Sequence, residues 1–116
     1  MNRQARKRLI DALEACQMVQ RFVAGRSFEE YDTDPLLSAA VERKLEVIGE
    51  ALRLADAADP AVGEAIPDVR RIVSMRNRII HGYDAVDNEI VWGVVAVYLP
   101  RLAQRLEAAL AAEQTE

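Results

Sequence analysis

The stretch from Ser74 to Asp87, SMRNRIIHGYDAVD, contains the only histidine of the chain, His81, five residues after Arg76 and two before Tyr83. A guanidinium can hold a phosphate through two parallel hydrogen bonds, and an imidazole titrates near neutral pH and can move a proton. No paired carboxylates, glycine-rich phosphate loop or serine or cysteine nucleophile accompany the histidine. The groups suit metal-free cleavage of RNA, in which a base activates the 2′-hydroxyl of the substrate and cations stabilise the charge on phosphorus.

Such a reaction usually needs both a base and an acid, whereas this chain has one histidine. A complete site is simplest to build at a two-fold interface that brings His81 and Arg76 from two protomers together. The chemistry therefore predicts a homodimer.

The helix around these residues should have an apolar face formed by Val69, Ile72, Val73 and Ile80. Arg76 lies on that face, where the pattern predicts an aliphatic residue. Tyr83 follows it by seven residues, and Asn77 and His81 are four residues apart, so that four polar groups converge at one helix end. A structural interpretation is equally open, in which Arg76 pairs with Glu46 or Glu50 of the preceding helix and His81 caps a helix C-terminus.

Composition indicates one all-α domain that spans residues 1–116. Hydrophobic residues make up 51% of the chain and aromatic residues 5%, and no stretch alternates apolar and polar residues as a half-buried strand does. The single cysteine, Cys16, is best explained as a small buried apolar residue, and one cysteine with one histidine cannot form a zinc site within a single protomer. We therefore expect no metal and no cofactor.

Four helices are predicted, and the second is the clearest of them. The first runs from about Gln4 to Ala24 and is followed by the loop GRSFEEYDTD. Asp34 can cap the second helix with Pro35 in its first turn. Its apolar residues are Leu37, Val41, Leu45, Ile48, Leu52 and Ala55.

The other two helices enclose the segment that carries the polar groups. AADPAVGEAI is rich in turn residues, after which Pro67 opens a third helix that Gly82 ends. Asp87 caps a fourth helix, in which Pro100 removes a backbone donor and should cause a kink. The inward residues of this helix are Val91, Val95, Tyr98, Leu102, Leu106 and Ala109. The pattern predicts an up-and-down four-helix bundle with a kinked C-terminal helix.

Net charge and hydropathy narrow the class of protein. A formal charge of −4 argues against non-specific wrapping of nucleic acid, although arginines cluster near both the N-terminus and the polar segment. No segment has the roughly 18 apolar residues of a membrane span, and the N-terminus lacks the features of a signal peptide. We therefore expect a cytoplasmic protein without a membrane partner.

The residues RNRIIHGY, from Arg76 to Tyr83, resemble the R-N-x-x-x-H-x-Y signature of HEPN-domain ribonucleases, and in particular of HepT-like toxins. EVIGEAL, from Glu46 to Leu52, resembles the segment that these proteins carry on the preceding long helix. IPDVRRIVSMRN before the motif and LPRL after it also fit the layout of the family. The resemblance thus extends over nearly the whole chain.

The resemblance implies a homodimeric HEPN bundle that cleaves RNA without a metal, as the toxin of a type VII toxin–antitoxin system. It implies a partner antitoxin similar to MntA, a minimal nucleotidyltransferase that transfers AMP to Tyr83 and can form a larger assembly with the toxin. Carried over to this chain, Arg76 binds the scissile phosphate, His81 transfers protons and Asn77 orients the site. Glu46 and Glu50 are supporting residues by position.

Two other hypotheses remain. The chain can be a non-catalytic HEPN module that binds nucleotide or a nucleotidyltransferase partner, or a helical dimer whose motif is only a structural ion-pair network. Only the nuclease hypothesis predicts RNA fragments in EDTA.

Overall fold

The structure is a computed structural model, and it describes residues 1–67, 69, 71, 72, 74 and 87–114. These residues are all-α and contain no strand. The helices are α1 (Arg3–Val23), α2 (Phe28–Thr33), α3 (Pro35–Ala58), α4 (Ala61–Ala65), α6 (Asn88–Gly93), the π-helical turn η1 (Val94–Tyr98) and α7 (Leu99–Gln114).

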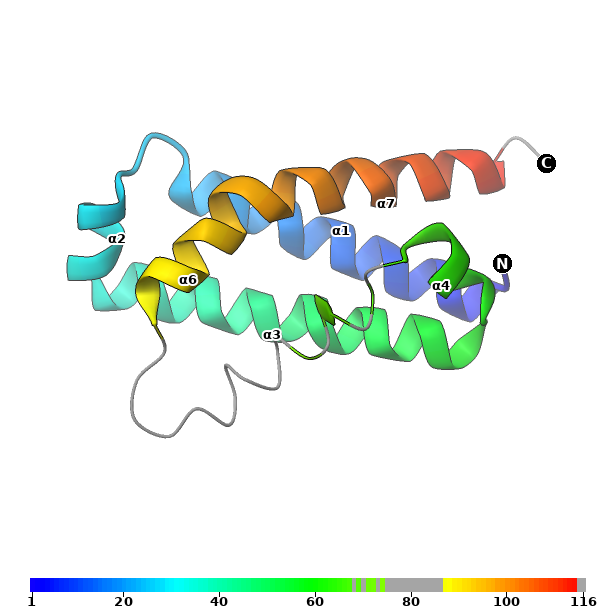
Figure 1. The fold of residues 1–116 in the computed structure, drawn as a ribbon. Coiled ribbons are helices and arrows are strands. Elements are labelled where there is room, and N and C mark those ends of the chain that lie inside the picture. The colour runs from blue at the N-terminus through cyan, green and yellow to red at the C-terminus, as the bar shows by residue number, and fades with distance from the viewer. Residues whose placement is uncertain (68, 70, 73, 75–86, 115–116) are drawn as a thin grey trace.

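The two long helices α1 and α3 form the main packing layer of the molecule (Figure 1). Asp34 Oδ1 accepts hydrogen bonds from the backbone N–H groups of Leu36 and Leu37, both at 3.1 Å, and Pro35 occupies the first turn of α3. The predicted cap of this helix is therefore confirmed. At the other end of α3, Asn2 Nδ2 donates to the carbonyl oxygen of Ala58 at 2.7 Å, which ties the start of α1 to the end of α3.

The hydrophobic core lies where α1, α3 and α7 meet. Every apolar residue predicted for the second helix is buried. Of the five residues predicted to form the apolar stripe of α1, Leu9, Cys16 and Val19 are buried, whereas Leu13 and Val23 are only half-buried. In the C-terminal helix the predicted inward residues Val91, Val95, Leu102 and Leu106 are buried, whereas Tyr98 and Ala109 are only half-buried. The apolar periodicity thus identifies most of the core correctly.

The prediction of an uninterrupted loop between α1 and α3 is wrong, because α2 forms there. Ser27 Oγ accepts from the N–H of Glu30 at 3.2 Å, and Glu30 Oε1 accepts from the N–H of Ser27 at 3.1 Å. This reciprocal capping box starts the helix. Tyr31 is fully buried and packs against Trp92, with ring centroids 5.4 Å apart. Local capping and one buried aromatic side chain therefore order this connection.

The second connection, predicted as a turn-rich segment, contains the short helix α4. Val62 and Ile66 are fully buried, so the segment contributes to the core. Figure 1 shows α4 near the N-terminus, at the opposite end of the molecule from α2.

The irregularity predicted at Pro100 takes the form of the π-helical turn η1. The N–H of Leu99 donates to the carbonyl oxygen of Val94, one residue farther back than in an α-helix. Figure 1 shows α6 running at an angle to α7 across this turn. A search of the described residues finds no helix with the length and apolar character that a membrane span requires.

The third predicted helix is described only in part. Val69 and Ile72 are buried and helical, as predicted, whereas Val73, Ile80 and Gly82 lie outside the described residues. The four-helix arrangement therefore stays a prediction.

Candidate active site

The motif residues Arg76, Asn77, His81 and Tyr83 lie outside the described residues, and so their predicted convergence stays a prediction. The structure does describe what holds the chain before and after the motif. Upstream, the side chains of Ile66, Val69 and Ile72 are buried, at steps of three residues. The chain that enters the motif is therefore fixed to the core.

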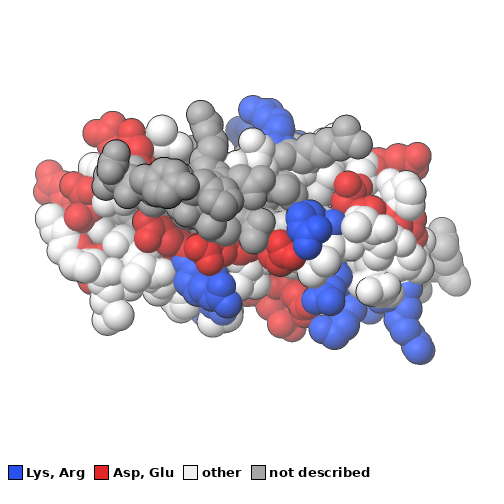
Figure 2. All heavy atoms as spheres, turned by 90° about the horizontal axis from the view of Figure 1, so that it is seen from below, with Lys and Arg blue, Asp and Glu red and all other residues white. Residues whose placement is uncertain are grey.

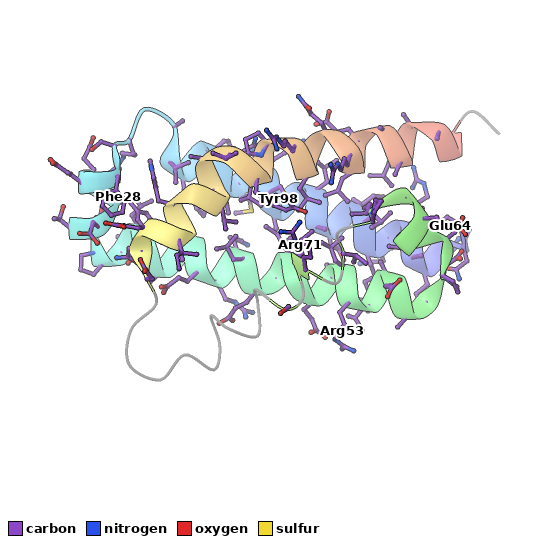
Figure 3. All side chains as sticks on the ribbon, viewed as in Figure 1. Phe28, Arg53, Glu64, Arg71 and Tyr98 are labelled. Carbon is purple, nitrogen blue, oxygen red and sulfur yellow. The ribbon has the colours of Figure 1, made fainter. Side chains whose placement is uncertain are left out.

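Downstream, the start of α6 is held at two points. Asp87 Oδ1 accepts from the N–H of Glu89 at 3.0 Å, which confirms the predicted cap. Asn88 Nδ2 donates to Asp32 Oδ1 of α2 at 2.9 Å. The rings of Trp92 and Phe28 also meet edge to face, 6.4 Å apart, and Figure 3 shows Phe28 on α2 at this end of the molecule. The helix that follows the motif, α6, is thus anchored to α2. The sequence-based prediction did not foresee this contact, because it placed a loop where α2 forms.

The two predicted supporting carboxylates each pair with an arginine of their own helix. Arg43 Nη1 lies 3.2 Å from Glu46 Oε2. Arg53 donates to both carboxylate oxygens of Glu50, at 3.2 Å from Nε and 2.5 Å from Nη2, and this hydrogen bond raises the pKa of the guanidinium. Figure 3 shows Arg53 extending from α3 away from the other helices. The pairing of Glu46 or Glu50 with the motif arginine stays untested.

The sequence-based prediction did not include a third carboxylate of α3, that of Glu42. Partial burial, followed by the nearby charge of Glu46, raises its pKa above the usual range for a glutamate. The signal in the sequence is the four-residue step that places Glu42, Glu46 and Glu50 in one row on α3. Figure 2 shows acidic side chains gathered along this face, with basic side chains beside them. Two of these three carboxylates, Glu46 and Glu50, are balanced by the paired Arg43 and Arg53.

Two hollows on the described surface differ from a phosphate-binding site. A groove of about 410 Å³ between α1 and α3 is lined by three basic and four acidic side chains. These are Arg8, Arg43 and Lys44, and Asp11, Glu14, Glu46 and Glu50. The charged residues that line a hollow of about 510 Å³ beside α4 are Asp56 and Glu64, as far as the described residues go.

The described side chains offer neither a metal site nor a reactive thiol. No three histidine, cysteine, aspartate or glutamate side chains among them come close enough together to hold a metal ion. Cys16 is fully buried, and burial raises the pKa of its thiol to about 12. The thiol is therefore protonated at neutral pH, as expected for a structural residue.

Comparison with known proteins adds an independent line of argument. Residues 12–109 match the family model described as Ribonuclease HepT-like. A protein of Thermococcus cleftensis named "Probable ribonuclease HepT" is 32% identical over 107 residues, which cover 92% of this chain and 96% of that protein. "Putative RNase TTE0752" of Caldanaerobacter subterraneus subsp. tengcongensis is 31% identical over 102 residues, which cover 88% and 90%. No solved structure matches the chain at a significant level.

Proposed function

Since this chain belongs to the HepT-like ribonuclease family, we propose that it is a metal-independent endoribonuclease whose site is the motif from Arg76 to Tyr83. The observation that carries the proposal is the match over residues 12–109, which contains the whole motif together with the helices on both sides of it.

In the proposed reaction, His81 takes the proton of the substrate 2′-hydroxyl as the 2′-oxygen attacks phosphorus. The bond from phosphorus to the 5′-oxygen breaks, and the protonated histidine of a second protomer supplies the proton that the leaving oxygen needs. Arg76 stabilises the charge that develops on the phosphoryl oxygens, and Asn77 orients the site by hydrogen bonding. The products are a 2′,3′-cyclic phosphate and a free 5′-hydroxyl.

The architecture that we propose for this site is an up-and-down four-helix bundle of the HEPN type, assembled as a homodimer. Residues 67–82 supply the remaining helix, with Val69 and Ile72 as its buried anchors. The dimer follows from the single histidine, because one protomer has one proton-transfer group of this kind.

Regulation is proposed to act on Tyr83, through a nucleotidyltransferase antitoxin similar to MntA that transfers AMP to its hydroxyl. The phosphodiester brings a negative charge close to Arg76 in the sequence, where it competes with the RNA phosphate. This makes the protein the toxin of a type VII toxin–antitoxin pair, active on RNA until it is modified.

The decisive experiment is cleavage of total RNA in EDTA by the purified protein. We expect the wild type to release fragments ending in 2′,3′-cyclic phosphate, and Arg76→Ala and His81→Ala to lose the activity with unchanged circular dichroism. Arg71→Ala is the matched control, since Arg71 is an exposed arginine five residues before Arg76 and should leave cleavage intact. Wild-type rates in the His81 variant would remove the proposed role.

The shared site can be tested by mixing wild-type chains with an excess of His81→Ala chains. Each mixed dimer retains one histidine, and because both histidines act in the proposed reaction, cleavage should fall below that of the same amount of wild-type protein alone. A monomeric protein with full activity would refute the shared site.

The modification is tested with the partner nucleotidyltransferase, ATP and magnesium. We expect the intact mass to increase by one or more AMP units and cleavage to stop, while Tyr83→Phe stays unmodified. Tyr31→Phe is the control, because Tyr31 is fully buried and cannot be reached in the folded protein. An adduct mapped to another tyrosine contradicts the assignment to Tyr83.

A further inference from the structure

The outer face of α6 and η1 is apolar although no described element covers it. Ile90 is 62% exposed and Val97 is 58% exposed. Between them, a Cβ atom added to Gly93 would meet nothing within 4 Å apart from its chain neighbours and the backbone of its own helix. This face therefore combines two large exposed aliphatic side chains with a point at which another backbone can approach closely.

Charges lie at both ends of this apolar centre, and their signs are opposite. Exposed residues follow one another at steps of four, in the order Glu89, Gly93, Val97 and Arg101. Neither Glu89 nor Arg101 has an ion-pair partner among the residues that the structure describes. The order is symmetric about Val95, since an acidic residue stands six positions before it and a basic residue six positions after it.

We infer that this face, formed by Glu89, Ile90, Gly93, Val97 and Arg101, binds the same face of a second copy of the chain in antiparallel orientation. An antiparallel pair centred on residue 95 places Glu89 opposite the partner's Arg101 and Val97 opposite the partner's Gly93. Each contact then occurs twice, as a two-fold axis requires.

A second copy fits this face better than an unrelated partner, because the face is complementary to itself in both shape and charge. The aliphatic side chain of Val97 fills the space beside glycine, and the two ends pair acid with base. The inference deepens the proposed function, on which it rests, by naming the surface that joins the two half-sites. α6 begins five residues after Tyr83 in the sequence, so that the interface directly follows the motif.

The first test introduces a charge at the centre of the face. Val97→Asp should convert the dimer to a monomer in sedimentation velocity at micromolar concentration, with unchanged circular dichroism. Leu36→Asp is the matched control, because Leu36 is 81% exposed on α3 outside this face. A Val97→Asp protein that remains dimeric overturns the inference.

The second test reverses one charge at a time and does not depend on removing an apolar contact. Glu89→Arg alone and Arg101→Glu alone each place two like-charged pairs in a homodimer, and both variants should dissociate at least several-fold more readily than the wild type. Mixing the two variants should give a heterodimer in which all four charges are paired with opposites. Equal stability of the two homodimers and the mixed dimer, measured at low salt, contradicts the antiparallel arrangement.

These tests distinguish a failure of the inferred interface from a failure of the proposed nuclease function. If His81→Ala loses cleavage while the wild-type dimer is insensitive to Val97→Asp and to both charge reversals, the nuclease assignment holds and the inferred interface is wrong. If Val97→Asp dissociates the dimer and the wild type does not cut RNA, the interface holds and the nuclease assignment is wrong.

Discussion

The α1–α3 face and the outer face of α6 both expose charged side chains, but these are paired on the first face and, among the described residues, unpaired on the second. On α1 and α3 the charges pair within one helix, as in Lys7 with Asp11 at 3.3 Å and Arg43 with Glu46 at 3.2 Å. On the outer face of α6 and η1, Glu89 and Arg101 lack an ion-pair partner among the described residues and flank an apolar centre.

The difference identifies the role of each face. A carboxylate that already pairs with a neighbouring arginine is balanced in solvent and gains little from a partner protein. Apolar side chains that stay in water, with oppositely charged residues at either end, gain from being covered. We therefore assign the stability of the fold to the α1–α3 layer and, in the inferred dimer, association to the outer face of α6.

The largest effect on stability is expected within the α1–α3 layer. Leu52→Ala removes a fully buried side chain of α3 and leaves a cavity, which should lower the free energy of unfolding by about 2–5 kcal/mol. Urea unfolding at fixed protein concentration measures the loss.

Leu36→Ala is the matched control, since Leu36 lies on the same helix and is 81% exposed. It should change the free energy of unfolding by no more than about 0.5 kcal/mol. Similar losses in both variants would mean that burial against α1 does not dominate the stability of α3.

Most of the fold follows from the sequence because apolar residues repeat every three or four positions. The buried side chains of α3 coincide with the predicted stripe, and the caps by Asp34 and Asp87 are present. The helices α2 and α4 were missed because each has only one or two turns, too few for periodicity to register. The Ser27–Glu30 capping box was the available signal for α2.

The candidate site follows from the sequence only at the level of residue types. A short motif with one arginine and one histidine indicates phosphate chemistry, but spacing alone cannot choose between a catalytic site and a structural ion pair. The four-residue spacing of Glu42 from Glu46 is visible in the sequence, but the raised pKa of Glu42 is not, because it depends on burial as well as on Glu46. Electrostatics of this kind is set by packing between helices and is not encoded locally.

An effect of intermediate size on the free energy of unfolding is expected at alkaline pH, from the buried Cys16 in the α1–α3 layer. Burial raises the pKa of Cys16 from 9.0 to about 12, so the folded state favours the protonated thiol. Its contribution to stability is fully present below pH 9 and is lost as the pH rises towards 12. By pH 11 the wild type should lose about 2.5 kcal/mol through this group, and Cys16→Ala should lack that part of the decline.

Tyr31→Phe provides an internal comparison, because the pKa of Tyr31 rises from 10.0 to about 12, through burial first and the charge of Glu42 second. It should remove a smaller part of the decline, about 1 kcal/mol at pH 11. Parallel curves of unfolding free energy against pH for the wild type and Cys16→Ala would contradict a dry environment around α1.

The smallest effect on the free energy of unfolding is expected when one of the paired surface charges of the α1–α3 face is removed. Arg43 is 72% exposed and its partner Glu46 is 32% exposed, so solvent screens their attraction. Arg43→Ala should therefore lower the free energy of unfolding by no more than about 0.5 kcal/mol, and even that difference should vanish in 1 M salt. Sedimentation should show an unchanged dimer, in contrast to Glu89→Arg on the outer face of α6. A dimer that dissociates on loss of Arg43 would reverse the comparison, because it would make the α1–α3 face the surface that a partner covers.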